Sequence, residues 1–488
     1  MQFLGQREMH KINHANIKDW AKNYKGELFD GILCDPPYHL TSMSKPRTDL
    51  EDYDNGKGNP YARRQAAMKG FMGKEWDGVD ENGIGIAQDP EMWRLLYNLL
   101  KPGAHLLAFS GSRTYHRMAV AIEDAGFEIR DMIEWVYGSG FPKSLNIGKE
   151  VDKIQGNERE VTGVTRIGKT SLGENSNWDT SDNMKAIKDG GRVDITKGTS
   201  EWEGYGTALK PAHEPCVLAR KPIEGTVAQN VLKHGTGGLN IDGTRVVHSV
   251  EPKFTNRTAP KSSGEKMGTF KENGNMATPN PTGRFPANLI HDGSDEVEAV
   301  FPQTGGGKAK EAGVGNGSSM FAGAGRTGFT IGDSGSASRY FYCAKASKSE
   351  RNAGLEGFEG NTQQTLIGNS PTCVDCNKTY NGTNNHNDCS GEMFNKPRVS
   401  QTNHHPTVKP LSLTKYLATL IKPPTGGRLL VPFSGSGSEV IGGLLAGWSY
   451  VEGVELTQEY IPISEARIRY WVENAKEESK QAKLWDDI

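Results

Sequence analysis

The stretch Phe29-Asp30-Gly31-Ile32-Leu33-Cys34-Asp35-Pro36-Pro37-Tyr38 is the part of the sequence around which the predicted fold is organised. Its first six residues form an apolar run with charge before it and prolines after it, which predicts a short buried strand. The strand ends in a carboxylate, two proline carbonyl groups and an aromatic ring. Prolines donate no N–H, so these carbonyls are not drawn into a helix or a ladder. Acceptors beside a ring that can stack suit the exocyclic amine of a nucleobase that has left its stack.

The alternative is that Asp35 to Tyr38 form only a turn, because Asp and Pro are common turn residues and Tyr often lies at a surface rim. Short motifs of this kind also arise by chance. A second motif, near residue 435, favours the functional interpretation.

Length and composition limit the classes of protein to consider. The 488 residues are enough for two or more domains, and the net charge of −2 shows no overall basic excess. Contact with nucleic acid therefore requires a local patch. No run of about 18 apolar residues predicts a membrane span, and the N-terminus lacks a signal-peptide core. Six cysteines are too few for a disulfide framework, so we expect an intracellular, cytoplasmic location.

Strands and helices alternate in two parts of the chain, residues 89–137 and 404–471. In the first part, Asp89 and Pro90 are typical of a helix start, and Gly126 is typical of a helix end. This alternation predicts a mostly parallel, doubly wound sheet covered on both faces. The halves of this α/β domain are expected at residues 1–224, with a polar insertion at about 150–205, and at residues 401–488.

Residues 225–400 lie between these halves and are dominated by Gly, Asn, Thr and Ser with scattered Lys and Arg. Such loops suit a surface that follows a phosphate backbone. The alternative is a disordered linker.

Half of the six cysteines fall within residues 373–389. Cys373 and Cys376 have CxxC spacing, and His386 and Cys389 follow closely, so the four side chains can close a tetrahedron around Zn²⁺. A metal would also supply folding energy to a segment without a core. The alternative is incidental cysteines in a polar loop.

The second motif follows a predicted strand at residues 429–431. It is Phe433-Ser434-Gly435-Ser436-Gly437-Ser438, and a helix is predicted after it. Glycines allow close backbone approach, and N–H groups at the helix start point at a ligand. Glu455 ends the next strand, where it can hold ribose hydroxyls. A dinucleotide site is an alternative, although Val440 replaces the third glycine of that motif.

Asp-Pro-Pro-Tyr, Phe-x-Gly-x-Gly and the preceding His405-Pro406-Thr407-Val408-Lys409-Pro410 together resemble the amino-methylating DNA methyltransferases. The catalytic motif comes first and the S-adenosylmethionine motif last, which resembles the beta-type order with a target-recognition region between them. Further stretches, including residues 106–144, 206–238 and 339–346, look like phage and prophage DNA methylases.

The resemblance implies a Rossmann-like S-adenosylmethionine-dependent methyltransferase sheet acting on double-stranded DNA. Asp35 and the carbonyl of Pro36, held by Pro37, would accept hydrogen bonds from the target amine, and Tyr38 would stack on the flipped base. Residues 433–438 would cradle S-adenosylmethionine, Glu455 would bind its ribose, and Thr407 and Lys409 would lie near its methionine end. A homodimer is also an expectation of the resemblance.

The resemblance favours adenine N6 as the methylated atom, because Ser-Pro-Pro-Tyr is more usual in cytosine enzymes. The alternatives are cytosine N4, RNA or a protein amide as target, and a catalytically silent DNA-binding protein that masks sites. Two usually acidic positions carry Val431 and Asn16 here. Because both acids would help to hold the cofactor, we expect modest cofactor binding.

Overall fold

The computed structural model describes residues 9–39, 77–80, 84–140, 144–166, 192–247, 283–304, 334–345, 349–356, 358, 372–373, 393–394, 403–405 and 407–486.

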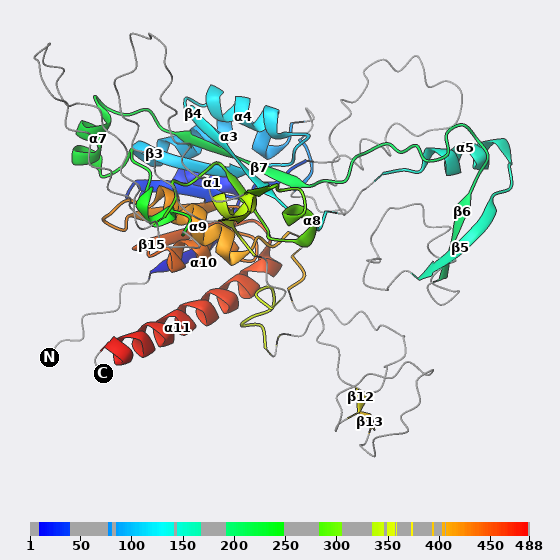
Figure 1. Cartoon of the computed structure of the whole chain (residues 1–488). Helices are drawn as coiled ribbons and strands as arrows, with labels where there is room; N and C mark the ends of the chain where they lie inside the picture. The colour runs from blue at the N-terminus through cyan, green and yellow to red at the C-terminus, as the bar shows by residue number, and fades with distance from the viewer. Residues whose placement is uncertain are drawn as a thin grey trace, which may run out of the picture.

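A nine-stranded sheet forms the centre of the described chain (Figure 1). Its strands, in spatial order, are β1 (His10–His14), β15 (Tyr450–Glu455), β14 (Arg428–Pro432), β2 (Phe29–Cys34), β3 (Leu100–Phe109), β7 (His213–Arg220), β4 (Glu128–Val136), β8 (Leu289–His291) and β11 (Tyr342–Cys343). Every neighbouring pair is parallel except the two pairs made by β7, which runs against both β3 and β4. The predicted mostly parallel sheet is therefore present.

Helices cover both faces of this sheet. One core cluster contains residues of α1 (Ile17–Asn23), α3 (Pro90–Asn98) and α4 (Tyr115–Asp124), and the other contains residues of α9 (Leu411–Ile421), α10 (Ser438–Leu445) and α11 (Ile461–Asp486). Successive residues of one strand enter opposite clusters: Ile32 packs in the first and Leu33 in the second. Because successive side chains of a strand point to opposite faces, a continuous apolar run fits a sheet buried on both sides.

The order of the strands places a crevice between β2 and β14. These strands are direct neighbours, with Leu430 opposite Ile32. From β2 the chain passes through α3 to β3 on one side, whereas from β14 it passes through α10 to β15 on the other. In open α/β sheets, ligands bind outside the carboxyl ends of strands at such a reversal. Asp35 follows β2 and Phe433 follows β14, so both motifs lie at this point.

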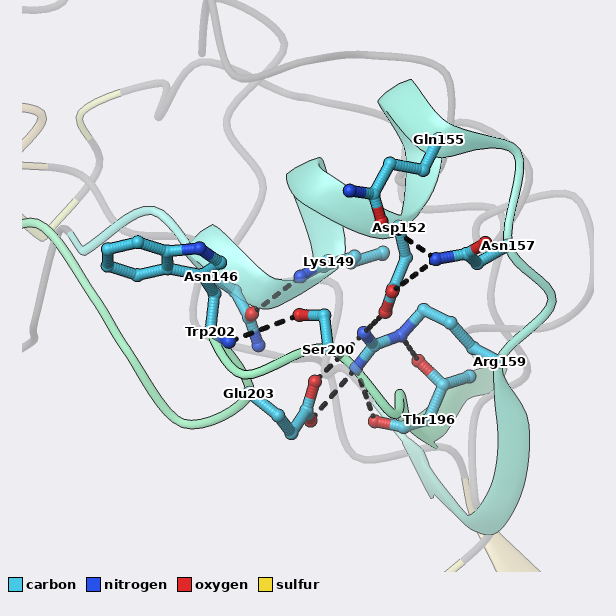
Figure 2. A network of polar contacts seen from close by, with 10 residues as sticks. All are labelled: Asn146, Lys149, Asp152, Gln155, Asn157, Arg159, Thr196, Ser200, Trp202 and Glu203. Atoms are coloured by element: carbon cyan, nitrogen blue, oxygen red, sulfur yellow. Dashed lines mark hydrogen bonds and ion pairs between the residues drawn. The ribbon is translucent and has the colours of Figure 1, made fainter.

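The predicted polar insertion leaves the sheet between β4 and β7 and lies away from it (Figure 1). Its described residues include α5 (Ile147–Gln155) and an antiparallel pair, β5 (Glu160–Arg166) and β6 (Arg192–Lys197). Figure 2 shows Arg159 at the centre of the polar contacts in this insertion. The guanidinium of Arg159 is paired with buried Asp152, and it donates to Glu203 at 3.0 Å and to the hydroxyl of Thr196 at 3.0 Å. These charge-assisted bonds tie the helix to the strand pair where apolar contacts are few.

The region predicted for target recognition contributes to the main sheet. Within residues 225–400, α7 (Val227–His234) contacts β3, and β8 and β11 extend the sheet beyond β4. Shorter elements there are α8 (Asp295–Glu298) and two strand pairs, β9 (Gln303–Thr304) with β10 (Gly335–Ser336) and β12 (Thr372–Cys373) with β13 (Met393–Phe394). Among the described helices, none is long and apolar enough to cross a membrane.

Candidate active site

A cavity of about 280 Å³ opens at the crevice between β2 and β14. Its wall combines side chains from segments far apart in the sequence: Ala15, Asn16, Ile17, Asp35, Pro36, Pro37, Tyr38, Asp77, Ile86, Glu214, His405, Thr407, Phe433, Ser434, Gly435, Ser436, Ser438, Glu439, Val454, Glu455 and Leu456. The Asp-Pro-Pro-Tyr motif and the glycine-rich turn therefore line the same space.

The carboxylate of Asp35 is held by a buried lysine. Nζ of Lys409 donates to Oδ2 of Asp35 at 2.5 Å and to the hydroxyl of Tyr38 at 3.1 Å, and it lies 3.1 Å from Oε2 of Glu214. Tyr38 in turn donates to Oε2 of Glu214 at 2.9 Å. Burial alone would lower the pKa of Lys409, but the charges of Asp35 and Glu214 raise it above its usual value. Lys409 is therefore a fixed cation that orients both motif side chains.

The other oxygen of the Asp35 carboxylate, Oδ1, has different surroundings. Oδ1 is buried and accepts no hydrogen bond from the described residues, although the side chain lines the cavity. A buried, unsatisfied acceptor costs free energy unless a ligand or water supplies a donor. This atom is therefore available to a donor that enters the cavity.

The backbone is strained just after the Asp-Pro-Pro-Tyr motif and at the start of the glycine-rich turn. Of the described residues other than glycine, His39 and Phe433 have positive φ, at 52° and 60°. His39 directly follows Tyr38, and Phe433 opens the glycine-rich turn. The N–H of His39 donates to Asp77 at 2.8 Å, which holds the first of these conformations in place. Non-glycine residues with positive φ are uncommon and concentrate at functional sites.

The glycine-rich turn joins β14 to α10 and rests on an acid from β15. Oε2 of Glu455 accepts from the N–H of Gly435 at 2.7 Å, and Oε1 accepts from Thr457 at 2.8 Å. A carboxylate has further lone pairs, so Glu455 can still accept hydroxyl donors. Gly435 has φ +49°, and a Cβ there would lie 2.7 Å from Nε2 of His405. The backbone thus approaches the cavity at a place that a side chain would fill.

Two buried titratable groups beside the turn have displaced pKa values. Burial, followed by the charge of Asp35, raises the pKa of Glu439 to about 7. Burial lowers the pKa of His405 to about 3, so its imidazole is neutral, and Nδ1 lies 2.9 Å from the carbonyl of Thr407. Perturbed pKa values of this kind cluster at functional sites.

The structure brings most of the predicted site residues together. Asp35, Pro36, Pro37, Tyr38, Thr407, Phe433, Ser434, Gly435, Ser436, Ser438 and Glu455 line the cavity. Gly437 precedes α10 with φ +85°. A Cβ at this position would lie 2.6 Å from the hydroxyl oxygen of Ser464, so the turn packs closely against that residue. Lys409 contacts Asp35 and Tyr38, and its place near the methionine end of the cofactor remains a prediction.

Three of the four predicted zinc ligands lie outside the residues that the structure describes. Cys373 is in β12, whereas Cys376, His386 and Cys389 lie outside the described residues. In the described part of the chain, no group of three or more His, Cys, Asp or Glu side chains is arranged to hold a metal ion.

Wall residues that the sequence did not predict as site residues include Glu214, His405 and Glu439. Glu439 had a recognisable signal, since it is an acid in the otherwise apolar helix α10 directly after the glycine motif. Glu214 had none, because its role depends on the reversed strand β7 meeting Tyr38.

The two departures from the methyltransferase pattern have different surroundings. Val431 is a residue of β14, is fully buried in the core and does not line the cavity. Asn16 does line it, and its side chain accepts from Lys18 to cap α1. A polar group therefore remains at one of the two positions.

Comparison with known proteins gives one sequence relative. No protein-family model matches the chain. Over 235 residues the chain is 25% identical to the type II methyltransferase M.HindIII of Haemophilus influenzae. The matched residues make up 45% of this chain and 61% of that protein. The match thus spans less than two thirds of its relative.

Solved structures also align with the chain, at low similarity. The M1.HpyAVI–SAM complex aligns with a TM-score of 0.33 and 12% identity, over 94% of this chain and 99% of that one. The cytosine-N4-specific PvuII DNA methyltransferase aligns with a TM-score of 0.38 and 9% identity, over 94% and 86%. Values this low add nothing to what the strand order shows.

The mostly parallel sheet with one reversed strand, and the cavity where the strand order reverses, define a doubly wound, Rossmann-like fold. Over part of its length, the chain is also similar in sequence to a type II methyltransferase.

Proposed function

We propose that this protein is a site-specific DNA methyltransferase that transfers a methyl group from S-adenosylmethionine to the exocyclic N6 amine of a flipped adenine in duplex DNA. The observation that carries the proposal is the buried, unsatisfied Oδ1 of Asp35 in the cavity that the glycine-rich turn also lines. An amine placed there would supply the missing donor.

The residues present fit S-adenosylmethionine. Ile17, Phe433 and Val454 give the wall apolar surfaces on which a purine can lie, and Glu455 keeps free lone pairs for ribose hydroxyls. The hydroxyl of Ser434 is buried without a partner among the described residues, so it offers a further polar contact. The cofactor would supply the methyl group, and the chain supplies its orientation.

The catalytic contribution of the chain is positioning and electrostatics. Asp35 and the carbonyl of Pro36 are proposed to accept the two N–H donors of the target amine, and Tyr38 to lie against the flipped base. Lys409 and Glu214 fix the tyrosine hydroxyl before substrate arrives. Preorganised partners of this kind lower the barrier because they need no rearrangement during the reaction.

Recognition of the DNA sequence is assigned to residues 225–400. Its described part carries arginine and aromatic side chains side by side: Arg284 lies 5.0 Å from the ring centre of Tyr340, and Arg245 lies 5.9 Å from that of Phe285. Phe285 is 66% exposed. Basic groups beside exposed rings suit contacts to phosphates and bases. The zinc site at residues 373–389, a homodimer and a phage or restriction-modification setting remain predictions.

The test is to incubate the full-length protein with methyl-labelled S-adenosylmethionine and duplex DNA, and then to identify the labelled nucleoside by mass spectrometry. The proposal predicts N6-methyladenine. Label in N4-methylcytosine would overturn the choice of adenine and keep the enzyme class. No label, with DNA still retained in a gel-shift assay, would indicate a silent DNA-binding protein.

A further inference from the structure

Carboxylates outnumber cations around the cavity. Asp35, Glu214, Glu439 and Glu455 line it, and Lys409 is the cation that contacts two of them. The wall is therefore negatively charged when all of these groups are ionised. A cavity of one charge sign, within low-dielectric walls, favours ligands of the opposite charge.

Glu439 is the member of this set to which the proposed function assigns no role. It lies in the first turn of α10, it is 5% exposed, and it follows the glycine-rich turn directly. The charges that act on it are Asp35, Lys409 and Arg467, and its own backbone N–H donates to its carboxylate. Arg467 is buried behind the turn and donates to Ser436 and Ser438.

Burying this acid is costly without a compensating ligand. Its pKa of about 7 means that it is half protonated near neutral pH, because burial and Asp35 oppose the charged form more strongly than Lys409 and Arg467 support it. A cation in the cavity would reverse that balance. The unsatisfied Oδ1 of Asp35 shows independently that the same wall is incomplete without a ligand.

We infer that Glu439 is the group by which the cavity distinguishes a positively charged methyl donor from its neutral product. This inference rests on the proposed function. S-Adenosylmethionine carries a sulfonium charge that S-adenosylhomocysteine lacks. With the donor bound, the Glu439 carboxylate is ionised and attracts that charge. With the thioether bound, no sulfonium charge is added to the cavity, so Glu439 keeps the protonation that it has in the empty cavity and the extra attraction is lost.

The test is isothermal titration calorimetry of both ligands at pH 7 in two buffers with different ionisation enthalpies, which reports the protons released on binding. For the wild-type protein, about half a proton should be released with S-adenosylmethionine and essentially none with S-adenosylhomocysteine. The donor should bind more tightly than the product. In E439Q the ratio of the two dissociation constants should fall by about tenfold, equivalent to about 1.4 kcal/mol, and proton release should disappear.

A matched control is E452Q. Glu452 is a buried acid of the neighbouring strand β15, lies 3.5 Å from Arg428 and does not line the cavity. This variant should keep the wild-type ratio and proton release. Equal proton release for both ligands in the wild-type protein, or an unchanged ratio in E439Q, would overturn the inference and leave the proposed function intact. Binding of neither ligand by the wild-type protein would overturn the proposed function itself.

Discussion

Nζ of Lys409 lies 2.5 Å from Oδ2 of Asp35, although 374 residues separate the two in the sequence. Lys409 precedes α9, and Asp35 follows β2 at the adjacent crevice, so the contact joins the two halves of the α/β domain. The buried pair leaves Oδ1 of Asp35 unsatisfied and orients Tyr38. The central arrangement is thus a carboxylate fixed on one side and open on the other.

Removal of this lysine should destabilise the protein. In Lys409→Met, Asp35 and Glu214 lose the cation that offsets their buried charges, and the free energy of unfolding should fall by about 3 kcal/mol. Urea unfolding followed by circular dichroism measures the change. Lys415→Met is the matched control, since Lys415 is exposed on α9, and it should change stability by less than about 0.5 kcal/mol. Equal effects of the two substitutions would contradict the assigned role of Lys409.

Gly435 should be intolerant of any side chain. In Gly435→Ala, the Cβ would lie 2.7 Å from Nε2 of His405 and the residue would remain at φ +49°, so we expect binding of S-adenosylmethionine to weaken strongly. Calorimetry measures the loss.

Gly447→Ala separates steric contact from backbone strain. Gly447 has φ +80°, but the nearest atom to its Cβ would be Nζ of Lys422 at 3.7 Å. This control should lose about 1 kcal/mol of stability and keep its affinity for the cofactor. If both variants bind the cofactor as the wild type does, the turn is not part of its site.

Glu439 should make stability depend on pH in a definite direction. Its pKa is raised from 4.5 to about 7 on folding, so its contribution is fully present below pH 4.5 and is lost as pH rises through 7. Relative to the wild type, E439Q should therefore become progressively more stable between pH 5 and pH 8, by up to about 3 kcal/mol. Unfolding midpoints of both proteins across this range give the difference. A difference that does not change with pH would show that Glu439 titrates normally.

Much of the fold could be predicted from local pattern. The apolar run at residues 29–34, the helix signals at Asp89 and Pro90, and the strand–turn–helix pattern around residue 435 each depend on neighbours in sequence. The doubly wound sheet follows from their alternation, and the structure contains it. The meeting of Asp35 and Gly435 in one cavity also followed, because strand ends at a reversal of strand order are adjacent.

The remaining features depend on contacts between distant segments. The sequence shows Glu214 only as a charged residue near a proline and Lys409 only as a residue expected near the cofactor, whereas the three-dimensional arrangement places both against Tyr38. The sequence predicts that the insertion is polar. Its folded structure depends on Arg159, which pairs with both Asp152 and Glu203, and the hydrophobic pattern of the sequence does not indicate these ion pairs. The strands β8 and β11 are too short for a hydrophobic pattern, so their place at the sheet edge was not foreseen.

The rate of methyl transfer to duplex DNA by Asp35→Ala, compared with its affinity for S-adenosylmethionine, is the decisive test of the proposed function. Asp124→Ala, at an exposed position in α4, is the control. We expect a loss of at least about 100-fold in rate for Asp35→Ala, since a preorganised acceptor is removed from the site of transfer. Its affinity for the cofactor should stay within about threefold of the wild type, because Glu455 and the glycine-rich turn are intact. An unchanged rate in a folded Asp35→Ala protein would contradict the account.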